Sequence, residues 1–66
     1  MVSRKKIDVI LLRVGASKVS QREWDFLKIL NSPDFSGIAI AQALLERRKP
    51  FEDTSQSIER LKRLAD

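Results

Sequence analysis

Hydrophobic residues recur at helical spacing along most of the chain, and polar or turn-forming residues separate the runs. The clearest run lies at residues 53–65, where Asp53 or Thr54 is placed to cap the first N–H groups of a helix. Its apolar face consists of Ile58, Leu61, Leu64 and Ala65. The pattern predicts an amphipathic helix at 53–65.

A second helix is predicted at about 20–31. Ser20 and Glu23 have the spacing of a capping box, in which each side chain accepts a hydrogen bond from the other residue's N–H. Ser32-Pro33 ends the helix, because a residue before proline avoids the helical region. Its apolar stripe is Trp24, Leu27 and Leu30.

A third helix is predicted at 36–48. Ser36 suits its N-cap, and Pro50 prevents it from continuing. The stripe facing the core is expected to contain Ile38, Ala41, Leu44 and Leu45. Phe51, in the turn that follows, is expected to return to the core.

The N-terminal segment, about 5–14, fits either a helix or a strand. As a helix it has a stripe formed by Ile7, Ile10, Leu11 and Val14. As a strand it has apolar residues on both faces. Gly15 lies where a helix would stop, which slightly favours the helix.

Together these segments predict one small, mainly α domain spanning residues 1–66. Its core would be trihelical (about 20–31, 36–48 and 53–65). Residues 1–18 would form an N-terminal arm and a dimerisation element, because so small a core gains stability from association. We expect a homodimer through residues 7–14.

Composition narrows the function. The chain has no cysteine and no histidine, so the usual metal ligands and hydrolytic groups are missing. We therefore expect no enzyme, no metal and no cofactor. The longest apolar run, Val9–Leu12, is far too short to span a membrane, which predicts a cytoplasmic protein with no membrane partner. A net charge of +4 and a pI near 10.0 favour polyanionic partners.

The helix predicted at 53–65 has a polar face opposite Ile58, formed by Gln56, Arg60 and Arg63. These are residue types that read DNA, since Gln can bond adenine in two places and Arg can bond guanine. The alternative is that this basic face is only solvated, as most such faces are.

The order of segments resembles helix-turn-helix proteins, in particular the first three helices of winged-helix transcriptional regulators and repressors of the MarR and PadR kind, without the wing. The likeness rests on Ser20–Glu23 with Leu27 and Leu30, on Ile38–Leu44, and on Ser57–Leu64. The resemblance implies sequence-specific binding of double-stranded DNA by a small transcriptional regulator or an accessory protein of a mobile element.

In such proteins the second helix of the pair is the recognition helix. The resemblance therefore implies base contacts from Gln56 and Arg60, and a base or phosphate contact from Arg63. It places Thr54, Ser55 and Ser57 near phosphates at the helix N-terminus. Three clustered cations in the preceding turn would replace the phosphate contacts of a wing: Arg47, Arg48 and Lys49.

Two other functions fit the pattern. If residues 6–14 form a strand, the chain has the order of a ribbon-helix-helix dimer, with Lys6, Asp8 and Ile10 facing the bases. The chain could instead be a protein-binding adaptor or inhibitor that occludes its partner. Its docking patch would then be the apolar residues left over from the core: Phe26, Ile29, Val9 and Leu12.

Overall fold

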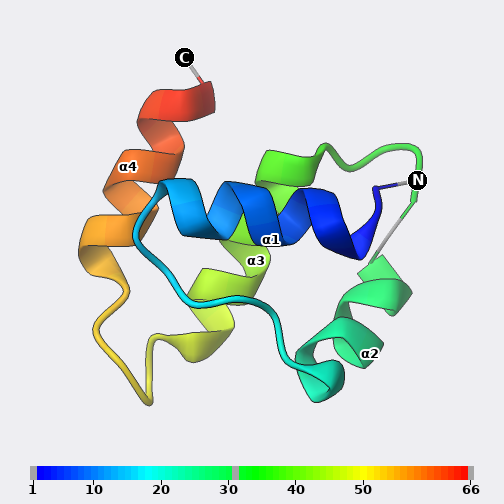
Figure 1. Ribbon diagram of the computed structural model, residues 1–66, viewed down its shortest axis with the longest axis horizontal. Coiled ribbons are helices and arrows are strands. Elements are labelled where there is room, and N and C mark those ends of the chain that lie inside the picture. The colour runs from blue at the N-terminus through cyan, green and yellow to red at the C-terminus, as the bar shows by residue number, and fades with distance from the viewer. Residues whose placement is uncertain (1, 31, 66) are drawn as a thin grey trace.

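The computed structural model describes residues 2–30 and 32–65, and these residues form four α-helices and no strand (Figure 1). The helices are α1 (Arg4–Arg13), α2 (Gln21–Leu30), α3 (Gly37–Arg48) and α4 (Ser55–Ala65). Helix α3 is central, since each of the other three helices packs against it. The mainly helical fold expected from the sequence is confirmed.

The N-terminal segment is helical. Ser3 caps α1 by accepting a hydrogen bond from the N–H of Lys6. Gly15 ends it with a φ of 79°, and the N–H of Ala16 donates to the carbonyl of Leu11 at 2.8 Å, as in a Schellman motif. Because residues 4–13 are helical, the strand that the ribbon-helix-helix alternative requires is not formed.

The predicted caps of the next two helices are confirmed. The N–H of Ser20 donates to Oε1 of Glu23 at 2.9 Å, and the N–H of Glu23 donates to Oγ of Ser20 at 3.2 Å. Oγ of Ser36 accepts from the N–H of Ala39 at the start of α3. Asn31, the predicted last residue of α2, lies outside the described residues.

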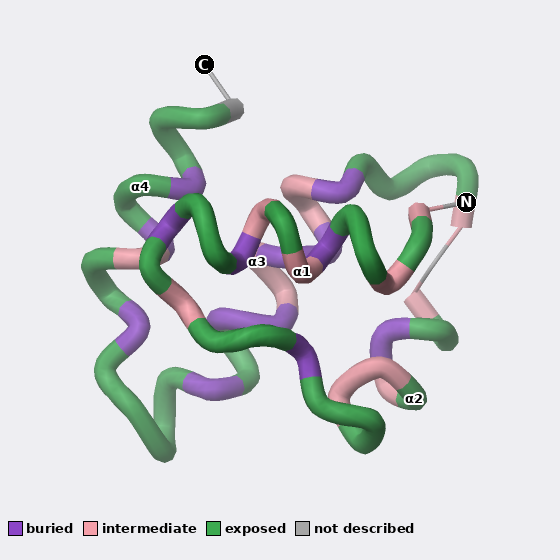
Figure 2. The backbone as a smooth tube through the Cα atoms, in the orientation of Figure 1, coloured by how far each residue is buried: buried purple, intermediate pink, exposed green. Residues whose placement is uncertain are grey.

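The core is a single apolar cluster around α3, and Figure 2 shows the buried positions turned toward it. The predicted stripes supply most of it, but some predicted residues are only partly buried: Ile10, Trp24, Leu30 and Ile38. Val19 and Ile40 are buried without having been expected. The buried residues are Ile7, Leu11, Val14, Val19, Leu27, Ile40, Ala41, Leu44, Leu45, Ile58 and Leu61.

Two expected core residues are instead exposed. The side chain of Phe51 is 90% exposed. Phe51 lies in a tight turn, in which the N–H groups of Phe51 and Glu52 both donate to the carbonyl of Arg48. Leu64 is 42% exposed near the end of α4. Ala65, expected on the same stripe as Leu64, lies outside the residues whose side chains the structure describes.

Candidate nucleic-acid interface

Helix α4 turns a polar face to solvent. Ile58 and Leu61 are buried in the core. Opposite them, the side chains of Gln56, Arg60 and Arg63 are all exposed. We call these three residues the polar ridge. Their spacing of four and three residues keeps them on one face of the helix.

Two side chains fix the start of α4, one buried and one exposed. Thr54 is buried, and its hydroxyl donates to the carbonyl of Leu45 at 3.0 Å, which ties α4 to the last turns of α3. Asp53 is exposed, and its Oδ1 accepts from the N–H of Ser55 at 3.1 Å. That hydrogen bond lowers the pKa of Asp53. The orientation of the polar ridge is thus set from the N-terminal end of the helix.

The polar ridge borders a shallow surface recess that also includes Ser55 and Glu59. Glu59 is exposed and lies one turn of helix from Arg63. The sequence pattern predicted no role for Glu59, because it lies beside the polar ridge and not on it. A carboxylate here repels phosphates, although it can accept a hydrogen bond from a cytosine amino group.

Arg60 also reaches the end of α1. A Cβ built on Gly15 would stand 2.8 Å from Nη1 of Arg60, so the guanidinium lies over the turn in which α1 ends. The carbonyls that finish a helix carry partial negative charge and favour a cation there. The central residue of the polar ridge is therefore supported by a neighbouring helix while it stays exposed.

The predicted phosphate contacts divide into outward and inward side chains. Ser55, Arg47 and Lys49 are exposed, and Ser57 is half-buried. The guanidinium of Arg47 stacks on the ring of Phe26, 4.0 Å from its centroid, so a cation–π contact holds it at the surface.

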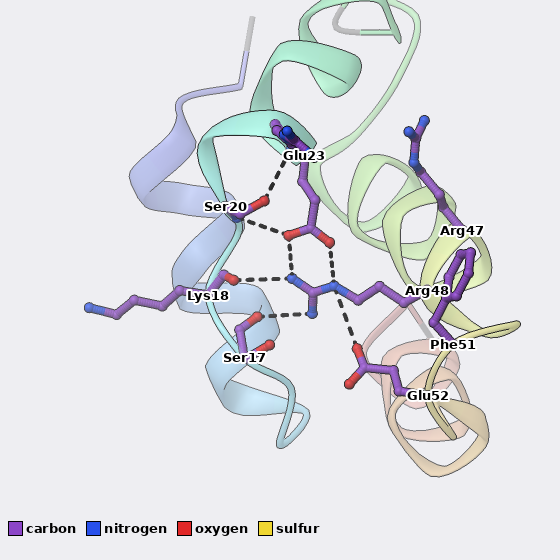
Figure 3. Close-up of a pocket in the computed structure, with 9 residues that line it drawn as sticks. Ser17, Lys18, Ser20, Glu23, Arg47, Arg48, Phe51 and Glu52 are labelled. Atoms are coloured by element: carbon purple, nitrogen blue, oxygen red, sulfur yellow. Dashed lines mark hydrogen bonds and ion pairs between the residues drawn. The ribbon is translucent and has the colours of Figure 1, made fainter.

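Arg48, predicted to meet phosphate, is only 8% exposed and its donors are used inside the protein (Figure 3). Its Nε and Nη2 bond the two carboxylate oxygens of Glu23 at 2.7 and 2.8 Å. Nη1 and Nη2 also donate to the carbonyls of Ser17 and Lys18, each at 3.1 Å. Arg48 therefore joins α3 to the connection before α2. Its position removes it from the candidate surface, and the inward hydroxyl of Thr54 removes that residue too.

The ion pair sets the protonation of both partners. Hydrogen bonding from Arg48 is the main cause that lowers the pKa of Glu23 from 4.5 to about 2, against the opposing effect of burial. The same hydrogen bonds raise the pKa of Arg48. Glu23 and Arg48 are 25 residues apart, so no local spacing signals their contact. The sequence pattern singled out Glu23 only as the capping-box partner of Ser20.

No group of three or more acidic, histidine or cysteine residues in the described part of the chain is placed to hold a metal ion. None of the described helices combines the length and the apolar character needed to cross a membrane.

Comparison with protein-family models, characterised proteins and solved structures finds no match to this chain. The likeness to winged-helix regulators thus rests on the sequence pattern alone.

Proposed function

We propose that the chain binds double-stranded DNA, with α2, α3 and α4 as a helix-turn-helix core and α4 as its recognition helix. The observation that carries this proposal is the exposed polar ridge backed by the buried Ile58 and Leu61. A helix that is anchored on one side and presents Gln and Arg on the other has the form needed to enter a major groove.

The dimensions of the polar ridge suit base reading. Gln56 and Arg63 are seven residues apart, which is about 10 Å along the helix at a rise of about 1.5 Å per residue. That length spans about three base pairs of B-DNA, at about 3.4 Å each. In this arrangement Gln56 bonds adenine, and Arg60 bonds guanine. Arg63 bonds a base or a phosphate.

Phosphate contacts would surround the bases. Ser55 and Ser57 lie in the first turn of α4, where the helix dipole favours an anion. Arg47 and Lys49 add exposed positive charge at the end of α3. These contacts position the protein without reading sequence.

Selection of bound sequences from random duplex DNA tests the proposal. We expect the unchanged chain to enrich a defined motif, and Arg60→Ala with Arg63→Ala to lose it. The control is Lys28→Ala with Lys62→Ala, which removes the same charge from exposed positions outside the polar ridge. If no motif is enriched, or if both variants behave alike, α4 is not a recognition helix.

Self-association through residues 7–14 stays a prediction. The outer face of α1 exposes Val9 and Leu12, which a dimer contact needs, but it also exposes Lys5 and Arg13, which would repel their counterparts. Sedimentation at tens of micromolar tests it, and a monomer would count against it.

A protein-binding adaptor is the second candidate. Ile29 on α2 favours it, because an aliphatic side chain 82% exposed is a ready docking contact. Phe26 is less available, since it is half-buried beneath Arg47. Under this alternative Ile29→Asp abolishes binding of the partner protein, whereas Arg60→Ala with Arg63→Ala does not.

A further inference from the structure

A mainly apolar groove of about 380 Å³ lies where α1, the start of α3 and the end of α4 come together. Figure 1 shows these two helix ends rising on the same side of α1. The apolar lining is Val9, Ile10, Ile38 and Leu64. This groove is separate from the polar ridge, because none of the ridge residues lines it.

The groove is left open by the way α4 extends beyond its packing partners. Ile58 and Leu61 are buried, but Leu64, the next residue of the same stripe, is 42% exposed. On α1, Val9 is 50% exposed. Apolar side chains gathered around a recess at the surface favour contact with another apolar surface.

The charged side chains that line the groove in the described part of the chain are both cations. Lys6 and Arg13 of α1 line it, together with the N-terminus of α3, whose dipole adds partial positive charge. Among the described residues, no carboxylate is part of the lining. Asp8, also on α1, is turned elsewhere and accepts from the N–H of Val19 at 2.9 Å.

We propose that this groove binds an acidic amphipathic helix of a partner protein. Lys6 and Arg13 are seven residues apart, about 10 Å or two helical turns, which suits a partner that places leucine-like residues two turns apart and carboxylates beside them. Burial of the apolar side chains supplies affinity, and the two cations select acidic over basic segments.

Other occupants fit less well. A second copy using the same face would bring Lys6 and Arg13 against like charges. The DNA backbone matches the charge but gains nothing from the apolar lining.

A library of random 16-residue peptides is the probe that tests the inference. We expect selection on the unchanged chain to enrich peptides that carry apolar residues at helical spacing with Asp or Glu between them. Amide chemical shifts measured with one such peptide should change at Val9, Ile38 and Leu64. Lys6→Glu with Arg13→Glu should weaken its binding at least about tenfold through charge repulsion. Leu64→Asp should do the same.

Two variants outside the groove serve as matched controls. Lys18→Glu with Arg22→Glu makes the same change in net charge, and Phe51→Asp introduces a carboxylate at another exposed apolar residue. Both should leave peptide binding unchanged, and thermal unfolding verifies that every variant is folded.

Four results would overturn the inference. These are recovery of no peptide that depends on Lys6 and Arg13, enrichment of basic peptides, a dimer in sedimentation that Leu64→Asp dissociates, and shifts at Val9 and Ile38 caused by duplex DNA.

Discussion

Single side chains with long-range contacts hold the outer elements of this molecule in place. Arg48 donates four hydrogen bonds, two to the Glu23 carboxylate and one each to the carbonyls of Ser17 and Lys18. Glu23 also accepts from the N–H of Ser20. One carboxylate thus caps α2 and fixes α2 to the end of α3. A buried charge with all these partners costs much more to disrupt than a surface ion pair does.

Glu23→Gln should therefore lower the free energy of unfolding. The difference between a pKa of 4.5 and one of about 2 corresponds to at most about 3 kcal/mol, since solvent screens a carboxylate that is partly exposed. Because the folded state lowers this pKa, the stabilisation is complete above about pH 4.5 and disappears as the pH falls to about 2. Urea unfolding of both proteins should show the gap closing over that range. Asp25→Asn, at an exposed ion pair, is the control. A gap that is the same at pH 7 and pH 2 would contradict the ion pair.

Gly15 offers a second test at the level of one residue. Its φ of 79° is unfavourable for any residue with a Cβ, so Gly15→Ala should cost about 1–2 kcal/mol. The close approach of Arg60 adds little to this cost, because its guanidinium is the end of a flexible side chain and can move aside. The cost should therefore be nearly the same in an Arg60→Ala background, and thermal unfolding of the four proteins measures the difference. A much smaller cost without Arg60 would show that the guanidinium is held rigidly on this turn.

At the scale of the helices, the sequence predicted the helix ends, because these depend on residues close together in the chain. Ser20 with Glu23, Ser36 and Gly15 fix where helices begin or end, and the structure confirms each. Spacing could not show which face each helix buries at its ends, because that depends on neighbours distant in sequence. Phe51 was expected inside for its hydrophobicity, but it is exposed in the turn after α3, while the charged Arg48 beside it is buried.

The sequence also predicted only part of the candidate site. The exposed ridge on α4 follows from the period of its apolar residues. The inward positions of Arg48 and Thr54 do not follow from it, since their partners, Glu23 and Leu45, lie on other elements. The groove beside Leu64 could not be predicted either, because it is assembled from three helices.

The exposed turn between α3 and α4 and the buried face of α4 should respond differently to mutation. Phe51→Ser should change the free energy of unfolding by less than about 0.5 kcal/mol, as expected for a surface site. Leu61→Ala, at a fully buried position of α4, should cost about 2–5 kcal/mol. Urea denaturation measures both. A large loss for Phe51→Ser would show that the turn packs inward.

For the whole molecule, the distribution of charge matters more than its sum. A net charge of +4 gives any protein some affinity for DNA, and that affinity falls with salt whether or not binding is specific. The structure divides the cations into those buried in internal contacts, such as Arg48, and those exposed where phosphate could reach them, such as Arg47 and Lys49. Only the second group should contribute to the release of counterions.

This division predicts the salt dependence of DNA binding. Replacing Arg47 and Lys49 with Gln should reduce the slope of log Kd against log salt by about 1.8, at about 0.9 per phosphate contact. The Arg48→Gln variant should instead be less stable, because the Arg48 guanidinium is paired with Glu23 inside the protein. Where the variant is folded, its binding should show the same salt slope as that of the unchanged chain. Fluorescence anisotropy with a labelled duplex between 50 and 200 mM salt, in the range where charge effects are large, measures each slope. A reduced slope for Arg48→Gln at full folding would mean that the ion pair opens to bind DNA, whereas an unchanged slope for the double variant would remove the α3–α4 turn from the interface.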